Sequence, residues 1–250
     1  MSAVRSRPTP RGPLIDEIFI RGFLLNGAGC TSLPGALKPI VLYISGNKDR
    51  LVDYNTYTSS QIAKLGNAII FLCEQIQPIT PVSKTHILKL VFILEEEAIK
   101  KTGIPFFGLH YHVWKLGPVS EDLYYELSEE LSLLKPYISK KTNADGTTLI
   151  APAKAFEDDE FSDQDLALMR EVADRFKFCS ASELINYTHK TGSPWYDTAV
   201  ANGVLQELEL QKINTTDIEI DLEKLIEHDP LKKQLYQEYQ EFIAQVSSLK

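Results

Sequence analysis

Two histidines of this sequence, His110 and His112, are spaced in a way that suits metal chemistry. Alternate side chains of an extended strand point to the same side, so both imidazoles would share one face if this segment is extended. Imidazole is a frequent zinc ligand, but the sequence supplies no third ligand that can be named. We favour packing or partner contact for the pair, and we keep a metal-dependent enzyme using His110 and His112 as an alternative.

Lys89 is the next residue with chemical potential, because it interrupts the apolar run from Ile87 to Leu94. Burying an unpaired ammonium costs several kcal/mol and lowers the pKa of the lysine. We therefore expect Lys89 to pair with acids such as those at 95–97, or to reach the surface along its apolar stem. A functional anchor is the alternative interpretation.

The common signatures of catalysis are absent from the sequence. It has no G-x-x-x-x-G-K-[ST] loop, no G-x-S-x-G elbow, no G-x-G-x-x-G turn and no H-E-x-x-H helix. Cys30, Cys73 and Cys179 lie too far apart for a paired metal-ligand spacing, and Cys73 is expected to be a small core residue. We expect no enzyme, no catalytic residue, no metal and no cofactor.

The elements that must position these residues are mostly helices. A capping-box sequence at Thr58 begins a first helix, which Pro78 ends. Ser83 can cap a second helix that runs to about Lys101. This second helix is apolar on every side except at Lys89, which is typical of a central helix.

Residues 103–150 follow a different pattern. Residues 106–114 are aromatic and β-branched, which predicts a short extended segment. Pro118 is expected in the first turn of a third helix with a buried leucine stripe. The stripe consists of Leu123, Leu127, Leu131 and Leu134. Turn residues 143–146 between two arms that carry Thr and Ile predict a β-hairpin over 137–150.

Further helices follow, led by Ser162, by Ser180 and by Ser193 with Pro194. Residues 218–220 suggest a short strand, and Asp229-Pro230 opens a last helix whose apolar seam we expect to dock on the core. The fold class predicted is mainly α: a compact helical domain with a small β-hairpin, an α+β arrangement in which winged-helix-like elements are an option.

The charge divides the 250 residues into two unlike parts. Residues 1–57 hold 7 basic and 4 acidic residues, together with 11 of the 26 glycines and prolines, so we expect a poorly ordered leader. Residues 58–250 hold 19 basic and 30 acidic residues, a net charge of −11, which disfavours non-specific binding to nucleic acid. We expect a helical domain over 58–215 and a C-terminal helix within 216–250 that packs on it.

No apolar run approaches the about 20 residues that a membrane-spanning helix needs. Three cysteines do not make a disulfide framework, which suits a reducing compartment. We therefore expect a cytoplasmic protein without membrane contact.

Short motifs occur in a characteristic order between residues 60 and 200. They are Lys89-Leu90-Val91-Phe92, Trp114-Lys115-Leu116-Gly117-Pro118-Val119, Leu123-Tyr124, Thr188-His189 and Ser193-Pro194-Trp195. Their order and spacing resemble the Panacea domain, the SocA-like antitoxin and phage-associated family. The Gly117-Pro118-Val119 segment before a tyrosine-bearing helix is the most specific part, whereas Phe92 stands where a tyrosine is common.

The resemblance implies a mostly helical domain that acts through protein–protein contact. Family members resemble antitoxins that hold a toxin encoded nearby inactive, and some are similar to adaptors that deliver a toxin to a cytoplasmic AAA+ protease. The resemblance implies no established catalytic residue. The partner-binding or family-motif positions it implies are Lys89, Trp114, Gly117, Pro118, Val119, Tyr124, His189, Pro194 and Trp195.

A DNA-binding transcriptional regulator is the second hypothesis. Helices followed by the 137–150 hairpin suit a winged-helix-like unit, and Lys135, Lys140 and Lys141 would place positive charge on the wing for phosphate contacts. The net charge of −11 over residues 58–250 counts against this hypothesis. Both roles are compatible in one protein, since an antitoxin can also regulate its own promoter.

Overall fold

The computed structural model describes residues 57–248 of the chain. The predicted leader, apart from its last residue Tyr57, lies outside the described residues, and so does Cys30. No helix in the described part of the chain is long and apolar enough to cross a membrane.

The fold is mainly helical, as predicted, with two small two-stranded antiparallel sheets. The helices described are α1 (Ser59–Ile76), α2 (Lys84–Thr102), α3 (Glu121–Ser128), α4 (Asp163–Phe176), α5 (Ala181–Thr188), α6 (Pro194–Ala201), α7 (Leu205–Glu209), the 3-10 helix η1 (Leu222–Ile226) and α8 (Pro230–Ser248). The strands are β1 (His112–Trp114), β2 (Gly117–Val119), β3 (Ile138–Thr142) and β4 (Thr148–Pro152).

Local sequence signals fix where most helices begin. Four helices begin with a complete capping box, at Thr58, Ser83, Ser162 and Ser180. In each box the capping side chain accepts from the backbone amide of the third helical residue, and the side chain of that third residue accepts from the backbone amide of the cap. Ser193 caps α6 in the same manner without the return bond. The predicted starts of these helices are therefore confirmed.

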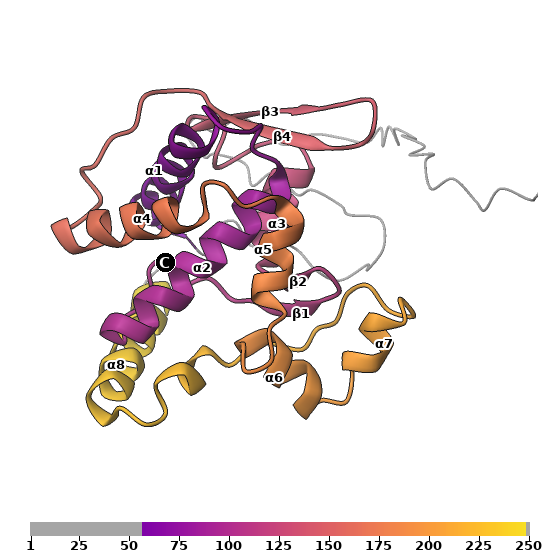
Figure 1. The fold of residues 1–250 in the computed structure, drawn as a ribbon. Coiled ribbons are helices and arrows are strands. Elements are labelled where there is room, and N and C mark those ends of the chain that lie inside the picture. The colour runs from indigo at the N-terminus through magenta and orange to yellow at the C-terminus, as the bar shows by residue number, and fades with distance from the viewer. Residues whose placement is uncertain (1–56, 249–250) are drawn as a thin grey trace, which may run out of the picture. The chain divides into compact units, whose positions relative to one another are not determined.

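Helix α2 is the central element (Figure 1). It contacts α1, α3, α4, α5, α8 and η1 as well as β2 and β4. Its apolar residues from Ile87 to Leu94 are 0–6% exposed, which confirms the prediction of a helix buried on every side. Gly103 ends it in a left-handed conformation, with φ of 78°.

The β3–β4 hairpin is the predicted one, with slightly shifted bounds. Its register pairs Lys140 with Ile150 and Thr142 with Thr148. Ile138 and Ile150 are buried, and the hairpin contacts α1. The extended segment predicted over 106–114 shrinks to β1, which pairs with β2 so that Val113 lies opposite Pro118.

The prediction of the third helix is wrong for both its first and its last residues. Pro118 lies in strand β2, and the helix begins after Ser120. It stops at Ser128, so Leu131 and Leu134 follow the helix instead of continuing its stripe. The physical reason is the Glu126 carboxylate, which accepts from the amides of residues 132 and 134 and holds that loop in a non-helical course.

The C-terminal segment lies against the central helix. Residues 218–220 form no strand, only an isolated bridge between Glu219 and His112. Helix α8 contacts α2 and η1, and Lys232 donates to the Lys100 carbonyl at 2.8 Å. Within its predicted apolar seam Leu231 and Phe242 remain exposed, so only part of the seam is covered.

Candidate functional site

Lys89 lies at the centre of the candidate site. Its side chain is 1% exposed, and Nζ donates to the Pro118 carbonyl at 2.8 Å. The expectation that it reaches the surface is wrong, and its bond goes to a strand carbonyl instead of a carboxylate. This contact ties β2 to the central helix.

Gly117 is the point where three polar side chains converge. A β-carbon at this position would lie 2.7 Å from Thr188 Oγ1, 3.0 Å from Lys89 Nζ and 3.2 Å from His189 Nε2. Its φ of 99° is a conformation that residues with a side chain rarely adopt. Glycine is therefore required here both by the backbone and by the space that the neighbouring groups occupy.

Aromatic side chains enclose the site. The imidazole of His189 stacks on Trp195 with ring centroids 3.9 Å apart and an angle of 9° between the planes. Trp195 Nε1 donates to the Trp114 carbonyl at 2.8 Å, which fixes α6 against β1. The Trp114 ring in turn meets Tyr124 edge to face at 4.9 Å.

Burial controls the charge of the site. It lowers the pKa of Lys89 to about 7, because burial removes the ammonium from solvent. It also lowers the pKa of His189 to about 4, and the neighbouring Lys89 adds to this shift. His189 is therefore a neutral imidazole at physiological pH.

Two ring nitrogens of the site are buried without a hydrogen-bond partner among the described residues. They are Trp114 Nε1 and His189 Nε2. Thr188 Oγ1, in contrast, donates to the Ile185 carbonyl at 2.9 Å. The arrangement holds together the β1–β2 pair, the end of α5 and the start of α6. The Lys89 amine at its centre is covered.

The structure brings the motif residues together from distant parts of the sequence. Lys89 comes from α2, Trp114 and Gly117 from the paired strands, and His189 and Trp195 from the region where α5 ends and α6 begins. Pro118, Val119 and Pro194 are buried at the same place in the fold, and Tyr124 contacts Trp114. Thr188, which belongs to the Thr188-His189 motif but not to the predicted site residues, also faces Gly117.

The two histidines proposed as metal ligands are not brought together with a third ligand. His110 Nδ1 lies 2.6 Å from Glu219, whereas His112 Nδ1 lies 3.7 Å from Glu121. Across residues 57–248 no group of three or more His, Cys, Asp or Glu side chains has a geometry that could hold a metal. Each histidine therefore faces its own carboxylate.

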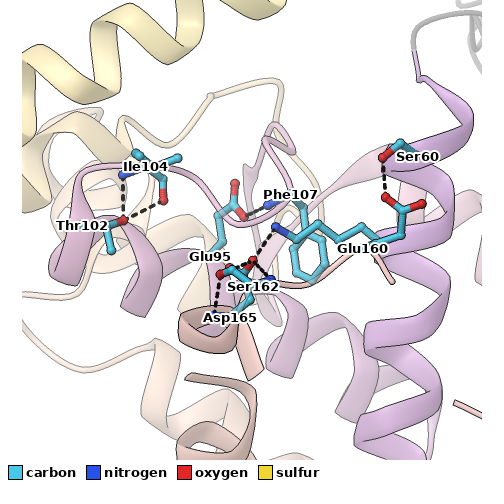
Figure 2. A network of polar contacts seen from close by, with 9 residues as sticks. Ser60, Glu95, Thr102, Ile104, Phe107, Glu160, Ser162 and Asp165 are labelled. Carbon is cyan, nitrogen blue, oxygen red and sulfur yellow. Dashed lines mark hydrogen bonds and ion pairs between the residues drawn. The ribbon is translucent and has the colours of Figure 1, made fainter. Parts of the chain in front are cut away.

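The sequence interpretation missed Glu95, which is 1% exposed on α2. Its carboxylate accepts from the amide of Phe107 at 2.7 Å (Figure 2). It also accepts from the amide of Gly108 at 2.8 Å. Burial raises its pKa to about 7, against the opposing effect of these amides. The sequence does contain a signal for a buried acid, the three successive glutamates 95–97 on a helix that is buried on every side. Successive residues of a helix are 100° apart around its axis, so these three side chains cannot all face water.

Residues 87–196 match the model of the family described as antitoxin SocA-like, Panacea domain. The match confirms, over these residues, the resemblance inferred from the motifs. No curated protein and no solved structure gives a significant match to the sequence.

Proposed function

We propose that this protein is an antitoxin-like binding module that neutralises a partner toxin, encoded nearby, by direct contact. The observation that carries the proposal is the match of residues 87–196 to the SocA-like antitoxin domain. The convergence of the family motifs on one buried cluster around Lys89 supports it. The cluster holds the strands and α6 in place, so it sets the shape of the surface above it.

A non-catalytic role is part of the proposal. The Lys89 amine is covered and bonded to the Pro118 carbonyl, which leaves it no route to a substrate. Burial raises the pKa of the Cys73 thiol to about 12, the opposite of what a nucleophile needs. His110 and His112 are each directed to a separate carboxylate.

The contact surface proposed includes the turn between β1 and β2. Leu116 at this turn is 52% exposed, although Gly117, Pro118 and Val119, which follow it, are buried. A partner that covered this side chain would remove its apolar surface from water, which favours binding. The motif cluster would then not contact the toxin itself. It would hold the turn in the position from which Leu116 contacts the toxin.

Co-expression with the adjacent gene tests the proposed function. Growth arrest by that gene product should be relieved by this protein, and the two should co-purify. Leu116→Asp should weaken the relief by about tenfold or more at equal protein level, since a charge in an apolar contact is costly. Arrest that persists with the wild-type protein would contradict neutralisation.

Delivery of the toxin to a cytoplasmic AAA+ protease is the finer form of the proposal. In that case the toxin half-life should shorten when this protein is present and recover in cells that lack the protease. A simple neutraliser would leave the half-life unchanged. Shortening that depends on the cytoplasmic protease would place the protein in the cytoplasm with its partner.

DNA binding is the less supported alternative. Lys140 is half-buried on β3 and directs Nζ to the Leu127 carbonyl at 3.4 Å, so it is not free for phosphate. Lys135 and Lys141 are exposed. A gel shift with the protein's own promoter tests this role, and a complex that weakens with salt would support autoregulation.

A further inference from the structure

The central helix α2 begins with a capping box whose third residue is a histidine. Ser83 is the cap, and its hydroxyl oxygen accepts from the amide of His86 at 3.4 Å. In return, His86 Nδ1 accepts from the amide of Ser83 at 3.2 Å and lies 2.7 Å from Ser83 Oγ. Glutamate and glutamine are the usual residues at this position of a capping box. Unlike glutamine, a histidine can gain a positive charge in mildly acidic solution.

These contacts determine which ring nitrogen of His86 carries the proton. A backbone amide can only donate, so the Nδ1 atom that faces the Ser83 amide must offer a lone pair. The proton of the neutral ring is therefore on Nε2. This atom is buried and has no hydrogen-bond partner among the described residues. A second proton can be added only at Nδ1, at the place to which the N–H of Ser83 already points.

The surroundings of His86 disfavour a positive charge. The residue is 6% exposed, and burial lowers the pKa of its imidazole, against an opposing effect of the Cys179 backbone. The first turn of α2 holds no acidic residue. The dipole of α2 places its positive end at the same turn, which adds to the repulsion of a cation.

The ionisable groups around this end of α2 do not offset such a charge. They include Lys84 on α2, Lys140 on β3, Lys177 at the end of α4, Cys179 before α5, Glu74 on α1, Glu126 on α3 and Glu183 on α5. The three lysines repel a cation. Glu126 accepts from the amides of residues 132 and 134, and Glu183 accepts from Ser180. Glu74 is exposed to solvent.

The residues at the capping box also hold the β3–β4 hairpin. Ser83 forms an isolated bridge with Leu149 of β4, and the Val82 carbonyl accepts from the amide of Ile150 at 2.8 Å. A change in the backbone of Ser83 therefore reaches β4 directly. We propose that His86 is a pH-sensitive switch, in which protonation of Nδ1 breaks the capping box at Ser83 and releases the β3–β4 hairpin from the start of α2. The proposal goes beyond the antitoxin function and is tested on the isolated protein.

The switch should open on acidification. The pKa of His86 is lower in the closed state than its ordinary value of 6.5, so the open state binds the proton more readily below pH 6.5. The closed state is therefore fully favoured above pH 6.5 and loses stability as the pH falls below it. Between pH 7.5 and pH 5.5, a free imidazole with a pKa of about 6.5 favours opening by up to about tenfold.

Hydrogen exchange of the full chain, followed by mass spectrometry at pH 7.5, 6.5 and 5.5, measures the opening. Each rate is divided into the rate of an unstructured chain at the same pH, which gives a protection factor. Protection of residues 82–87 and 148–152 should fall about fivefold to tenfold from pH 7.5 to pH 5.5, whereas protection of residues 90–99 should change by less than about twofold. No fall at residues 82–87 and 148–152 would overturn the proposal.

Two variants connect the effect with His86. His86→Gln completes the capping box without titrating, so it should keep its protection at pH 5.5. His228→Gln is the matched control and should behave as the wild type, because the His228 side chain is 93% exposed and lies outside the box. An equal loss of protection in His86→Gln and the wild type would refute the role of His86. Nitrogen NMR of the wild-type imidazole gives a further test, since a proton on Nδ1 at pH 7.5 would also refute it.

Discussion

Lys89 and Glu95 show how a helix buried on all sides holds two charged residues. Neither side chain is more than 1% exposed. Lys89 donates to a strand carbonyl, and Glu95 accepts from loop amides, so backbone groups stabilise both. Burial brings the pKa of each to about 7, from opposite directions. Both residues therefore make the stability of the fold depend on pH.

Replacing Lys89 by methionine should reveal this dependence. Its pKa falls from 10.5 in the unfolded chain to about 7 in the folded protein, so between these values the unfolded chain binds the extra proton. The free energy of unfolding of the wild type should therefore rise from pH 7 to pH 10.5 relative to Lys89→Met, and the difference should be flat below pH 7. Urea unfolding at pH 6, 8 and 9.5 measures this difference.

Lys101→Met is the control for that experiment, because Lys101 lies on the same helix, is exposed and pairs with Glu171. A rise of the same size relative to Lys101→Met would mean that removing any charge from this helix produces it. A constant difference between wild type and Lys89→Met across the whole range would mean that Lys89 keeps its ordinary pKa in the fold.

At the scale of elements, the helices with local stop and start signals were predictable from the sequence. Capping boxes at Thr58 and Ser83 and the left-handed Gly103 depend only on nearby residues. The end of α3 was not predictable, because it depends on Glu126 accepting from amides that follow the helix. The strand position of Pro118 depends likewise on Lys89, which is distant in sequence.

The candidate site was predictable as a set of residues but not as an arrangement. Motif order indicated that Trp114, Gly117, His189 and Trp195 act together, and the structure places them around Lys89. No local pattern indicated that the lysine would bond to a carbonyl. Glu95 was missed because its partners are backbone amides, which carry no signature in the side-chain sequence.

The packing of the β1–β2 pair on α2 should depend on the absence of a side chain at Gly117. Gly117→Ala forces a β-carbon within 2.7 Å of Thr188 Oγ1 and strains the left-handed backbone, so we expect a loss of about 2–4 kcal/mol in the free energy of unfolding. Gly146→Ala is the matched control, since Gly146 also has a positive φ, 83°, but nothing lies within 4 Å of its β-carbon.

The control should lose only about 1 kcal/mol, which is the cost of the backbone conformation alone. Denaturant unfolding of both variants measures the comparison. Equal losses in the two variants would show that the space at Gly117 is not closed by its neighbours.

For the whole molecule, the matched family domain is smaller than the packed unit. Residues 87–196 include most of α2 and continue to the start of α6, but α1, η1 and α8 also contact α2. Tyr236 of α8 packs against the core, and the backbone of Lys232 lies against Gly103. We propose that the folded domain extends over 58–215 with the helix of 216–250 packed on it.

Truncation tests the contribution of α8. Removing residues 230–250 should lower the free energy of unfolding by about 2–4 kcal/mol, because it uncovers the partly buried Tyr236 and the apolar surface beneath it. Removing only 241–250 should change it by less than about 1 kcal/mol, since Phe242 is 60% exposed. Thermal or urea unfolding of both truncated proteins measures the losses, and equal losses would contradict a docked first half of α8.

The charge of the chain determines how a toxin would approach it. Residues 58–250 carry a net charge of −11, so a partner that binds this surface should be basic, and part of the attraction should be long-range. The affinity of the proposed complex should therefore fall by about tenfold or more between 50 and 500 mM NaCl, mostly through a slower association rate. Stopped-flow association at several salt concentrations measures this, with sucrose of equal osmolality as the control for viscosity and hydration. An association rate independent of salt would mean that the toxin binds through apolar contacts such as Leu116 without electrostatic steering.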